Sequence, residues 1–281
     1  MPLIVPLDVH RLDILYPQES LCQMQNRKAF LTAVQQPAAS LDTVECALLF
    51  SQALNPGLDV QHYSDILASI SKDAKNSNIE SAEDLLSFVH GKHNFHGNPN
   101  DYYQIENSLL DSVLESKTGI PISLALIYLS VGHSTNLSVY GISFPGHFLV
   151  GVGMPSNVSL ESATLHEPDA IPADASRDSM IDPFRAQIVT RTQCFNLLDQ
   201  LYQGQVKHDD KYFAPAGKDT ILLRLIENVK TIYLKQGSAD QALTCLDYQL
   251  LISPGDANLL NQQQQLLEHI KKQGGDSSVV H

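Results

Sequence analysis

The segment that most constrains this fold is Gly-Ile-Pro-Ile-Ser-Leu-Ala, which begins at Gly119. We expect Gly119 to end the preceding helix with a positive φ, and Pro121 suits the first turn of a new helix, where its missing N–H costs nothing. The residues from Pro121 to His133 are apolar on most sides, so the sequence predicts a central buried helix over 121–133. Further helices are predicted over about 42–52, 59–71, 81–89 and 107–118.

Downstream of this helix the pattern changes to that of strands. Two β-rich runs, 139–144 and 147–153, are separated by Pro145-Gly146, a turn dipeptide that predicts an antiparallel pair. A third strand is predicted over 180–182. The segment between the second and third strands, 154–177, is rich in Pro, Ser, Ala and Asp and is predicted to be a long loop with at most a short strand. Together these elements predict an α+β domain.

Two polar residues, His147 and Asp182, lie in these apolar runs and follow the helix start in chain order. A thiol enzyme places its nucleophile at a helix N-terminus, a histidine beside it, and an acidic residue that orients the histidine. Here the helix start offers only Pro121 or Ser123. The four cysteines lie elsewhere, far apart and without a CxxC pair, so we expect reduced thiols rather than a disulfide framework or a zinc site.

Composition excludes several classes of function. The formal charge of −13 repels phosphate backbones and anionic membrane surfaces, so we expect no nucleic-acid binding. No apolar run reaches the roughly 20 residues that cross a bilayer, so we expect no membrane span. The N-terminal residues lack the pattern of a secretion signal, so we expect a cytoplasmic protein.

The C-terminal part predicts two helices joined by a short turn at 237–238, followed by a third helix. Its spacing resembles one tetratricopeptide repeat, although Lys230 replaces the usual glycine. The matching positions are Tyr233, Ala242, Leu246 and Pro254. We expect an N-terminal extension over 1–30, a core domain over 31–203, a linker over 204–219, tetratricopeptide-like helices over 220–273 and a disordered tail over 274–281.

Six ordered motifs resemble the SirB-type proteins, which are bacterial transglutaminase-like proteins with a C-terminal tetratricopeptide segment. The motifs are Asn94-Phe95-His96-Gly97-Asn98, Asp101-Tyr102-Tyr103, Asn107-Ser108-Leu109-Leu110, Gly119-Ile120-Pro121-Ile122-Ser123-Leu124, Phe144-Pro145-Gly146-His147-Phe148-Leu149 and Ile181-Asp182-Pro183-Phe184. The resemblance covers roughly residues 30 to 260. It implies a transglutaminase-like, papain-like α+β core with a helical N-terminal part and a small antiparallel sheet packed against the helix that begins at Pro121.

Catalytic members of the wider superfamily carry Gly-x-Cys-x-x-x-Ala at this helix, and that frame puts Pro121 at the cysteine. We therefore expect a non-catalytic, regulatory protein that binds a protein or peptide in a cleft around His147 and Asp182, and also through its C-terminal helices. We expect no cofactor, and the oligomeric state is left open. Candidate cleft walls are Asn98, Tyr102, Asn107 and Pro121.

Two other functions stay open from the sequence. One is a hydrolase or acyl transferase with Ser123 as nucleophile, His147 as base and Asp182 as the orienting acid. The other is metal binding by His90, His93 and His96, whose spacing of three residues could place the first two on one helical face. Because His96 falls in a loop rich in turn formers, 93–101, and no fourth ligand is indicated, we expect no metal.

Overall fold

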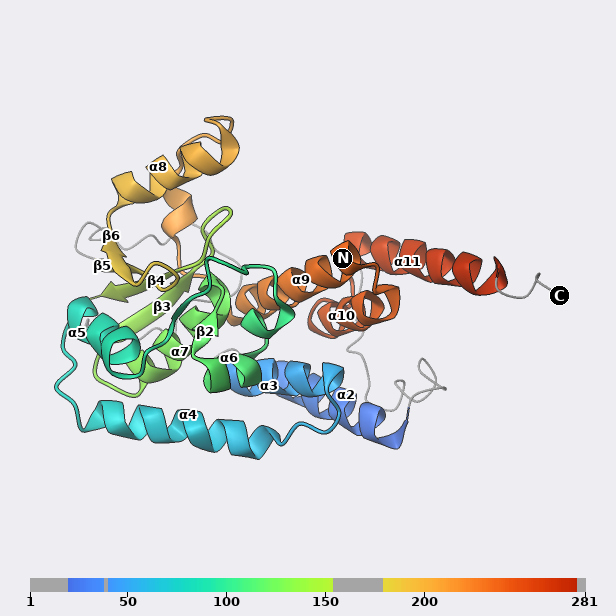
Figure 1. The fold of residues 1–281 in the computed structure, drawn as a ribbon, viewed down its shortest axis with the longest axis horizontal. Coiled ribbons are helices and arrows are strands. Elements are labelled where there is room, and N and C mark those ends of the chain that lie inside the picture. The colour runs from blue at the N-terminus through green and yellow to red at the C-terminus, as the bar shows by residue number, and fades with distance from the viewer. Residues whose placement is uncertain (1–19, 38–39, 154–178, 277–281) are drawn as a thin grey trace. The chain divides into compact units, whose positions relative to one another are not determined.

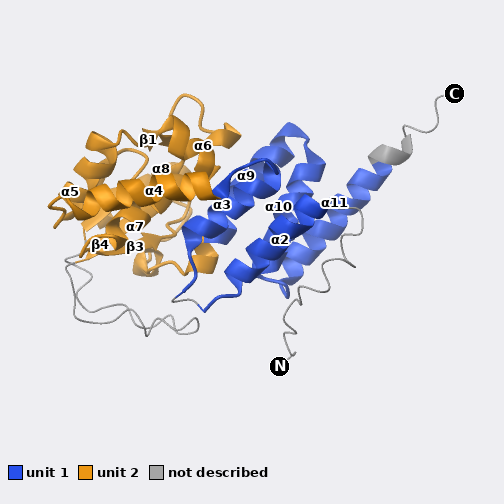
Figure 2. Cartoon of the chain, turned by 90° about the horizontal axis from the view of Figure 1, so that it is seen from below, with its two compact units in different colours: residues 1–60, 222–281 blue, residues 61–221 orange. Residues whose placement is uncertain are grey.

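A computed structural model describes residues 20–37, 40–153 and 179–276 of the chain (Figure 1). The chain divides into two compact units, residues 61–221 and residues 1–60 together with 222–281 (Figure 2). The loop expected over 154–177, most of the extension expected over 1–30 and most of the tail expected over 274–281 lie outside the described residues. No helix within the described ranges is both long and apolar enough to cross a membrane.

The unit of residues 61–221 contains a four-stranded antiparallel sheet in the order β3-β4-β5-β6. Its strands are β3 Ser138–Ile142, β4 Leu149–Gly153, β5 Ser179–Asp182 and β6 Gln187–Val189. The register pairs Val150 of β4 with Gly141 of β3 and with Ile181 of β5. The predicted pairing across Pro145-Gly146 is therefore confirmed, as is the third strand.

Helices surround this sheet. They are α4 Val60–Lys75, α5 Ala82–Leu86, the π-helix η1 Ser87–Lys92, the 3-10 helix η2 Ile105–Asn107, α6 Leu110–Ser116, α7 Pro121–His133, α8 Arg191–Tyr202 and the 3-10 helix η4 Asp210–Phe213. The helices predicted over 59–71, 81–89, 107–118 and 121–133 all correspond to helical segments in this set. No sequence pattern above predicts α8 or β6.

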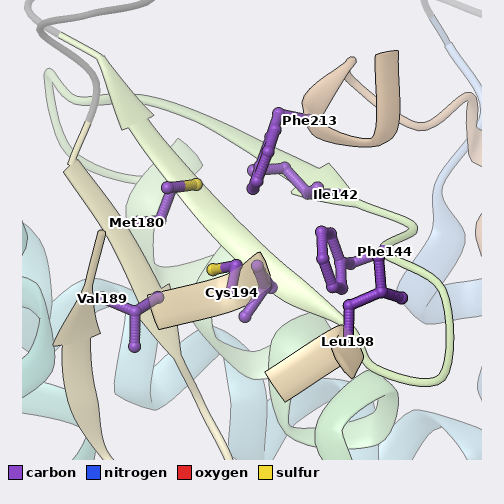
Figure 3. Close-up of a cluster of buried hydrophobic side chains, with 8 residues drawn as sticks. Ile142, Phe144, Met180, Val189, Cys194, Leu198 and Phe213 are labelled. Carbon is purple, nitrogen blue, oxygen red and sulfur yellow. The ribbon is translucent and has the colours of Figure 1, made fainter. Parts of the chain in front are cut away.

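The sheet lies between α7 and α8 (Figure 1). Gly132 of α7 packs so closely on Val139 of β3 that a Cβ at Gly132 would lie 2.6 Å from the Val139 side chain. The other face carries a buried apolar cluster shared by the sheet, α8 and η4 (Figure 3). Its members are Ile142, Phe144, Leu149, Met180, Val189, Cys194, Leu198 and Phe213. Alternate residues of a strand face opposite sides, so Asp182 lies on the same face of the sheet as Met180. Met180 belongs to the apolar cluster, so this is the face that α8 covers.

The expected role of Gly119 is corrected by the structure. The residue in the left-handed conformation after α6 is Lys117, with φ of +63°. Gly119 instead lies in the two-residue strand β2 Thr118–Gly119, which pairs in parallel with β1 His96–Gly97. A Cβ at Gly119 would lie 2.7 Å from Ser123 Oγ, so close approach to α7 rather than a positive φ favours glycine here.

The segment 204–219, expected as a linker, packs on the sheet. Phe213 of η4 is buried against Phe144, and Pro215 forms an isolated bridge with Ile142. The compact unit therefore extends to residue 221, beyond the expected boundary at 203.

The second unit consists of helices from both ends of the chain. They are α2 Leu21–Val34, α3 Thr43–Leu54, α9 Lys218–Gln236 (from Leu222 onward), α10 Ala239–Ile252 and α11 Ala257–Asp276. α10 contacts α2, α3 and α11. The helices predicted on either side of 237–238 are present, and Gly237 has φ of +73° in the turn. Residues 31–60 thus group with the C-terminal helices, and the tetratricopeptide-like character of these helices stays a prediction.

Candidate binding site around His147 and Asp182

His147 and Asp182 form a buried pair. Nε2 of His147 lies 3.0 Å from Oδ1 of Asp182, and only 8% and 2% of the two side chains are exposed. His147 directly follows the turn at Gly146, where φ is +69°, and its main-chain N–H donates to Phe144 O at 3.1 Å. Asp182 is the last residue of β5. The turn before β4 and the end of β5 therefore bring the two predicted residues together.

The carboxylate of Asp182 accepts several hydrogen bonds. Oδ1 accepts the main-chain N–H groups of Phe184 and Arg185, each at 3.0 Å, and Oδ2 accepts Nη1 of Arg185 at 2.9 Å. Pro183 ends the strand, which lets the following N–H groups turn back to the side chain. Burial acts to raise the pKa of Asp182, but the interactions with His147 and Arg185 outweigh it and lower the pKa below 3.8.

A cavity of about 210 Å³ opens beside this pair. Among the described residues that line it, none comes from α7, and most come from β6 and α8. The polar part of the lining is rich in side-chain amides, and the apolar part overlaps the cluster of Figure 3. The lining consists of His147, Asp182, Arg185, Gln187, Gln193, Asn196, Gln200, Cys194, Phe144, Leu149, Val189 and Leu197.

Cys194 is one of several lining residues that the sequence did not indicate. It is a free cysteine with 3% exposure, located in the first turns of α8. Burial, and then the charge of Asp182, raise its pKa to about 11, so the sulfur is a neutral thiol at physiological pH and a poor nucleophile. The capping box of α8, in which Thr190 and Gln193 bond reciprocally, was the signal that could have placed Cys194 on a helix.

The start of α7 carries no free nucleophile. Pro121 has none, and the hydroxyl of Ser123 donates to Asn107 O at 2.6 Å, with Ile120 O at 3.1 Å. The same oxygen accepts the main-chain N–H of Ile120 at 3.1 Å. Ser123 is fully buried and joins the helix start to the preceding loop. This geometry does not favour Ser123 as a nucleophile.

Asn98 and Asn107, expected as cleft walls, bond mainly to one another and to their own loop. Asn98 Nδ2 lies 3.4 Å from Asn107 Oδ1, and Asn107 Nδ2 donates to Asp101 O at 2.8 Å. Tyr102 is 37% exposed, and its ring lies edge-on to Phe184 at 5.5 Å. Neither asparagine nor Tyr102 is among the described residues that line the His147 cavity.

The three histidines considered for a metal site do not converge. His93 Nε2 lies 3.1 Å from Oδ2 of Asp73. His90 and His96 instead line a hollow to which His93 does not contribute. In the described part of the chain, no group of three or more His, Cys, Asp or Glu side chains is arranged to hold a metal ion.

The α+β fold, with α7, His147 and Asp182 in that order along the chain, can be compared with known families. A family model described as "Transglutaminase-like superfamily" matches residues 59–227, which include the whole of the sheet-containing unit. The chain therefore belongs to the transglutaminase-like superfamily.

Particular relatives come from bacteria and from mammals. A UPF0162 protein of Xylella fastidiosa is 26% identical over 235 residues, covering 80% of this chain and 76% of the relative. A UPF0162 protein of Vibrio cholerae is 24% identical over 223 residues, covering 77% and 76%. F-box only protein 21 of Homo sapiens is 27% identical over 290 residues, covering 92% of this chain but 43% of that protein. No solved structure matches the chain significantly.

Proposed function

We propose that this chain is a non-catalytic transglutaminase-like protein that binds a peptide segment of a protein partner in the cavity beside His147 and Asp182. The observation that carries the proposal is a paired histidine and aspartate that open into a cavity, without a reactive side chain at the start of α7.

The lining of the cavity suits a peptide. Side-chain amides both donate and accept hydrogen bonds, and therefore match the N–H and C=O groups of a peptide ligand. The cavity supplies Gln187, Asn196 and Gln200 for this purpose, together with the Nε2 donor of Gln193, whose Oε1 already accepts from Thr190. Apolar side chains beside them can bury the carbon atoms of the ligand, which is the usual composition of a binding pocket.

The competing function, hydrolysis or acyl transfer with Ser123 as nucleophile, requires Ser123 Oγ within about 3.2 Å of the His147 imidazole. Each hydrogen bond of the Ser123 hydroxyl in the described chain goes instead to a main-chain group. No observation favours this function over binding. Labelling of the wild type by a fluorophosphonate probe that spares Ser123→Ala would favour it.

The proposal also covers the location, the family branch and the role of the protein. We place the protein in the cytoplasm, in the SirB-type branch of bacterial transglutaminase-like proteins, and give it a regulatory role through its partner. The C-terminal helices, with their tetratricopeptide-like spacing, would add a second contact surface for that partner.

A peptide selection tests the binding site. The full chain is immobilised and used to select from a random dodecapeptide library, and the selected peptides are then tested against the double variant His147→Gln/Asp182→Asn. We expect binding to weaken at least about tenfold, which corresponds to about 1.4 kcal/mol.

The matched control is His208→Gln/Asp199→Asn. His208 and Asp199 also form a histidine–aspartate pair, at 2.9 Å, but 47% and 43% of these side chains are exposed and neither lines the cavity. Equal loss of binding in both double variants, or no loss in the His147 variant, would rule out the cavity as the binding site.

A further inference from the structure

A second hollow of about 560 Å³ lies at the turn between β5 and β6. We call it the histidine groove. Arg185 lines both this groove and the His147 cavity. The groove is lined by His90, His96, Gly97, Pro99, Phe184, Arg185 and Ala186.

The two imidazoles of the groove are fixed by main-chain carbonyls. His90 Nδ1 lies 3.0 Å from Phe95 O, and His96 Nδ1 lies 2.7 Å from Asn94 O. Because a carbonyl oxygen only accepts, each Nδ1 carries the hydrogen, and Nε2 is the remaining polar atom of each ring. Within the described residues, neither Nε2 has a hydrogen bond or an ion pair.

Arg185 adds a cation with spare donors. One donor, Nη1, bonds to Asp182, but the guanidinium has five N–H groups and 45% of the side chain is exposed. In an acidic chain, the groove stands out because its described lining contains no Asp or Glu. The groove therefore offers hydrogen-bond donors and positive charge to an oxyanion.

The shape of the groove is enforced by its backbone. A Cβ at Gly97 would lie 2.4 Å from Phe184 O, so the β5–β6 turn packs directly on β1. Ala186 has φ of +51°, a conformation that residues other than glycine rarely adopt. The turn that carries Arg185 is thus held in one conformation by its packing.

We propose that the histidine groove binds the carboxylate of an acidic residue in a protein partner. The planar fork of Arg185 matches a carboxylate, and protonated His90 and His96 donate from Nε2. Phe184 and Pro99 provide apolar contact for the carbon atoms of a peptide, which a free phosphate ion lacks. The groove shares Arg185 with the peptide cavity proposed above, but its two histidines do not line that cavity.

Binding in this way takes up protons. A carboxylate needs a donor, whereas a neutral imidazole presents a lone pair at Nε2, so binding favours the charged ring. The other charged groups on neighbouring elements include Lys117 before β2, Lys92 at the end of η1 and His93 just after it, and the acidic Glu83 and Asp84 of α5. Lys92 and His93 both pair with Asp73.

The test is a titration of the full chain with acetyl-Glu-Glu-amide, followed by NMR through the ring C–H signals of its histidines. We expect the ring signals of His90 and His96 to shift as the peptide binds, because both imidazoles line the groove. Acetyl-Gln-Gln-amide, which lacks the charge, should bind at least about tenfold more weakly.

Three arms make the result decisive. His90→Gln and His96→Gln should each weaken binding, whereas His208→Gln, which changes an exposed histidine outside the groove, should not. Equal affinity for the Glu and Gln peptides, or no shift of the His90 and His96 signals, would overturn the proposal. Inorganic phosphate binding as tightly as the Glu peptide would assign the groove to a free oxyanion and overturn the choice of a protein ligand. The NMR signals of His90 and His96 detect binding in the groove itself. If the His147 cavity fails to bind peptides, this result is therefore unaffected.

Discussion

Asp182 is the residue on which the candidate site depends, because its carboxylate joins the His147 imidazole to the Arg185 side chain. Since its folded pKa is lowered below 3.8, its ionised form stabilises the fold at neutral pH, and that contribution is lost as the pH falls through the folded value. At pH 7 we expect Asp182→Asn to lower the free energy of unfolding by about 1.5–3 kcal/mol.

Urea denaturation from pH 7 down to pH 3 measures this dependence. The difference between wild type and Asp182→Asn should be largest near neutral pH and should narrow in acid, because the Asp182 carboxylate of the unfolded chain has the higher pKa and takes up a proton before that of the folded chain. A difference that does not change with pH would mean that the carboxylate charge is not what stabilises the site.

Cys194 tests whether the cavity hides a reactive thiol. With a pKa of about 11, only about 0.1% of this sulfur is thiolate at pH 8, and the side chain is buried. We expect a thiol reagent such as DTNB to react rapidly with the exposed Cys22 and slowly with the buried cysteines. The rapid phase should disappear in Cys22→Ser. A rapid phase that persists in that variant and is lost on Cys194→Ser would show an activated thiol beside His147.

Among the secondary-structure elements, β1 packs directly on the β5–β6 turn. This contact fixes the position of the turn, which lines the histidine groove and follows the end of β5. Gly97→Ala places a Cβ against the Phe184 carbonyl, so we expect the free energy of unfolding to fall by about 1–3 kcal/mol. Gly91→Ala in η1 is the matched control, because its Cβ would meet only Ser87 Oγ at 3.6 Å, and we expect a change within about 0.5 kcal/mol. Equal effects in urea denaturation would contradict this account of the turn.

The elements that the sequence predicts are those with strong local signals. Pro121 followed by an apolar run specifies α7, and Pro145-Gly146 between β-rich runs specifies β3 and β4. α8 escapes prediction because its buried residues are few, chiefly Cys194 and Leu198, so its periodicity is weak. Lys117 takes the left-handed position after α6, whereas Gly119 packs closely on α7, a tertiary constraint that no local pattern contains.

The candidate site is predictable to the same limited extent. Chain order identifies His147 and Asp182, because His147 follows the turn dipeptide Pro145-Gly146 and Asp182 ends a predicted strand. The cavity itself depends on α8, so its amides and Cys194 are not visible in the sequence motifs. Asn98 and Asn107 are conspicuous in the motifs, but their side chains bond within the loop before α7.

Helices that lie far apart in the sequence, α2 and α3 on one side and α9, α10 and α11 on the other, form one helical unit. Arg27 of α2 lies 3.5 Å from Asp247 of α10, with 3% and 9% of the side chains exposed, and its guanidinium lies 5.3 Å from the centre of the Tyr248 ring. Gln263 of α11 donates to the same carboxylate at 2.6 Å. Gln263 belongs to the glutamine run 262–265, and this hydrogen bond helps to fix α11 on α10.

We expect Asp247→Asn to lower the free energy of unfolding by about 3 kcal/mol, because it removes the charge that faces a buried guanidinium. In a double-mutant cycle with Arg27→Met, the combined loss should be smaller than the sum of the single losses. The control is Asp240→Asn on the exposed side of α10, which should change stability by a few tenths of a kcal/mol. Strict additivity in urea denaturation would mean that Arg27 and Asp247 do not couple the two ends of the chain.

Mass spectrometry distinguishes binding from turnover in the His147 cavity, which we propose binds a peptide without transforming it. A peptide selected by the wild-type chain is incubated with that chain for a day at 25 °C, and the masses of peptide and protein are measured. We predict that both masses stay unchanged while the peptide remains bound. A change in the mass of the peptide, or a covalent adduct on the protein, that is absent with His147→Gln would contradict the claim and identify the protein as an enzyme.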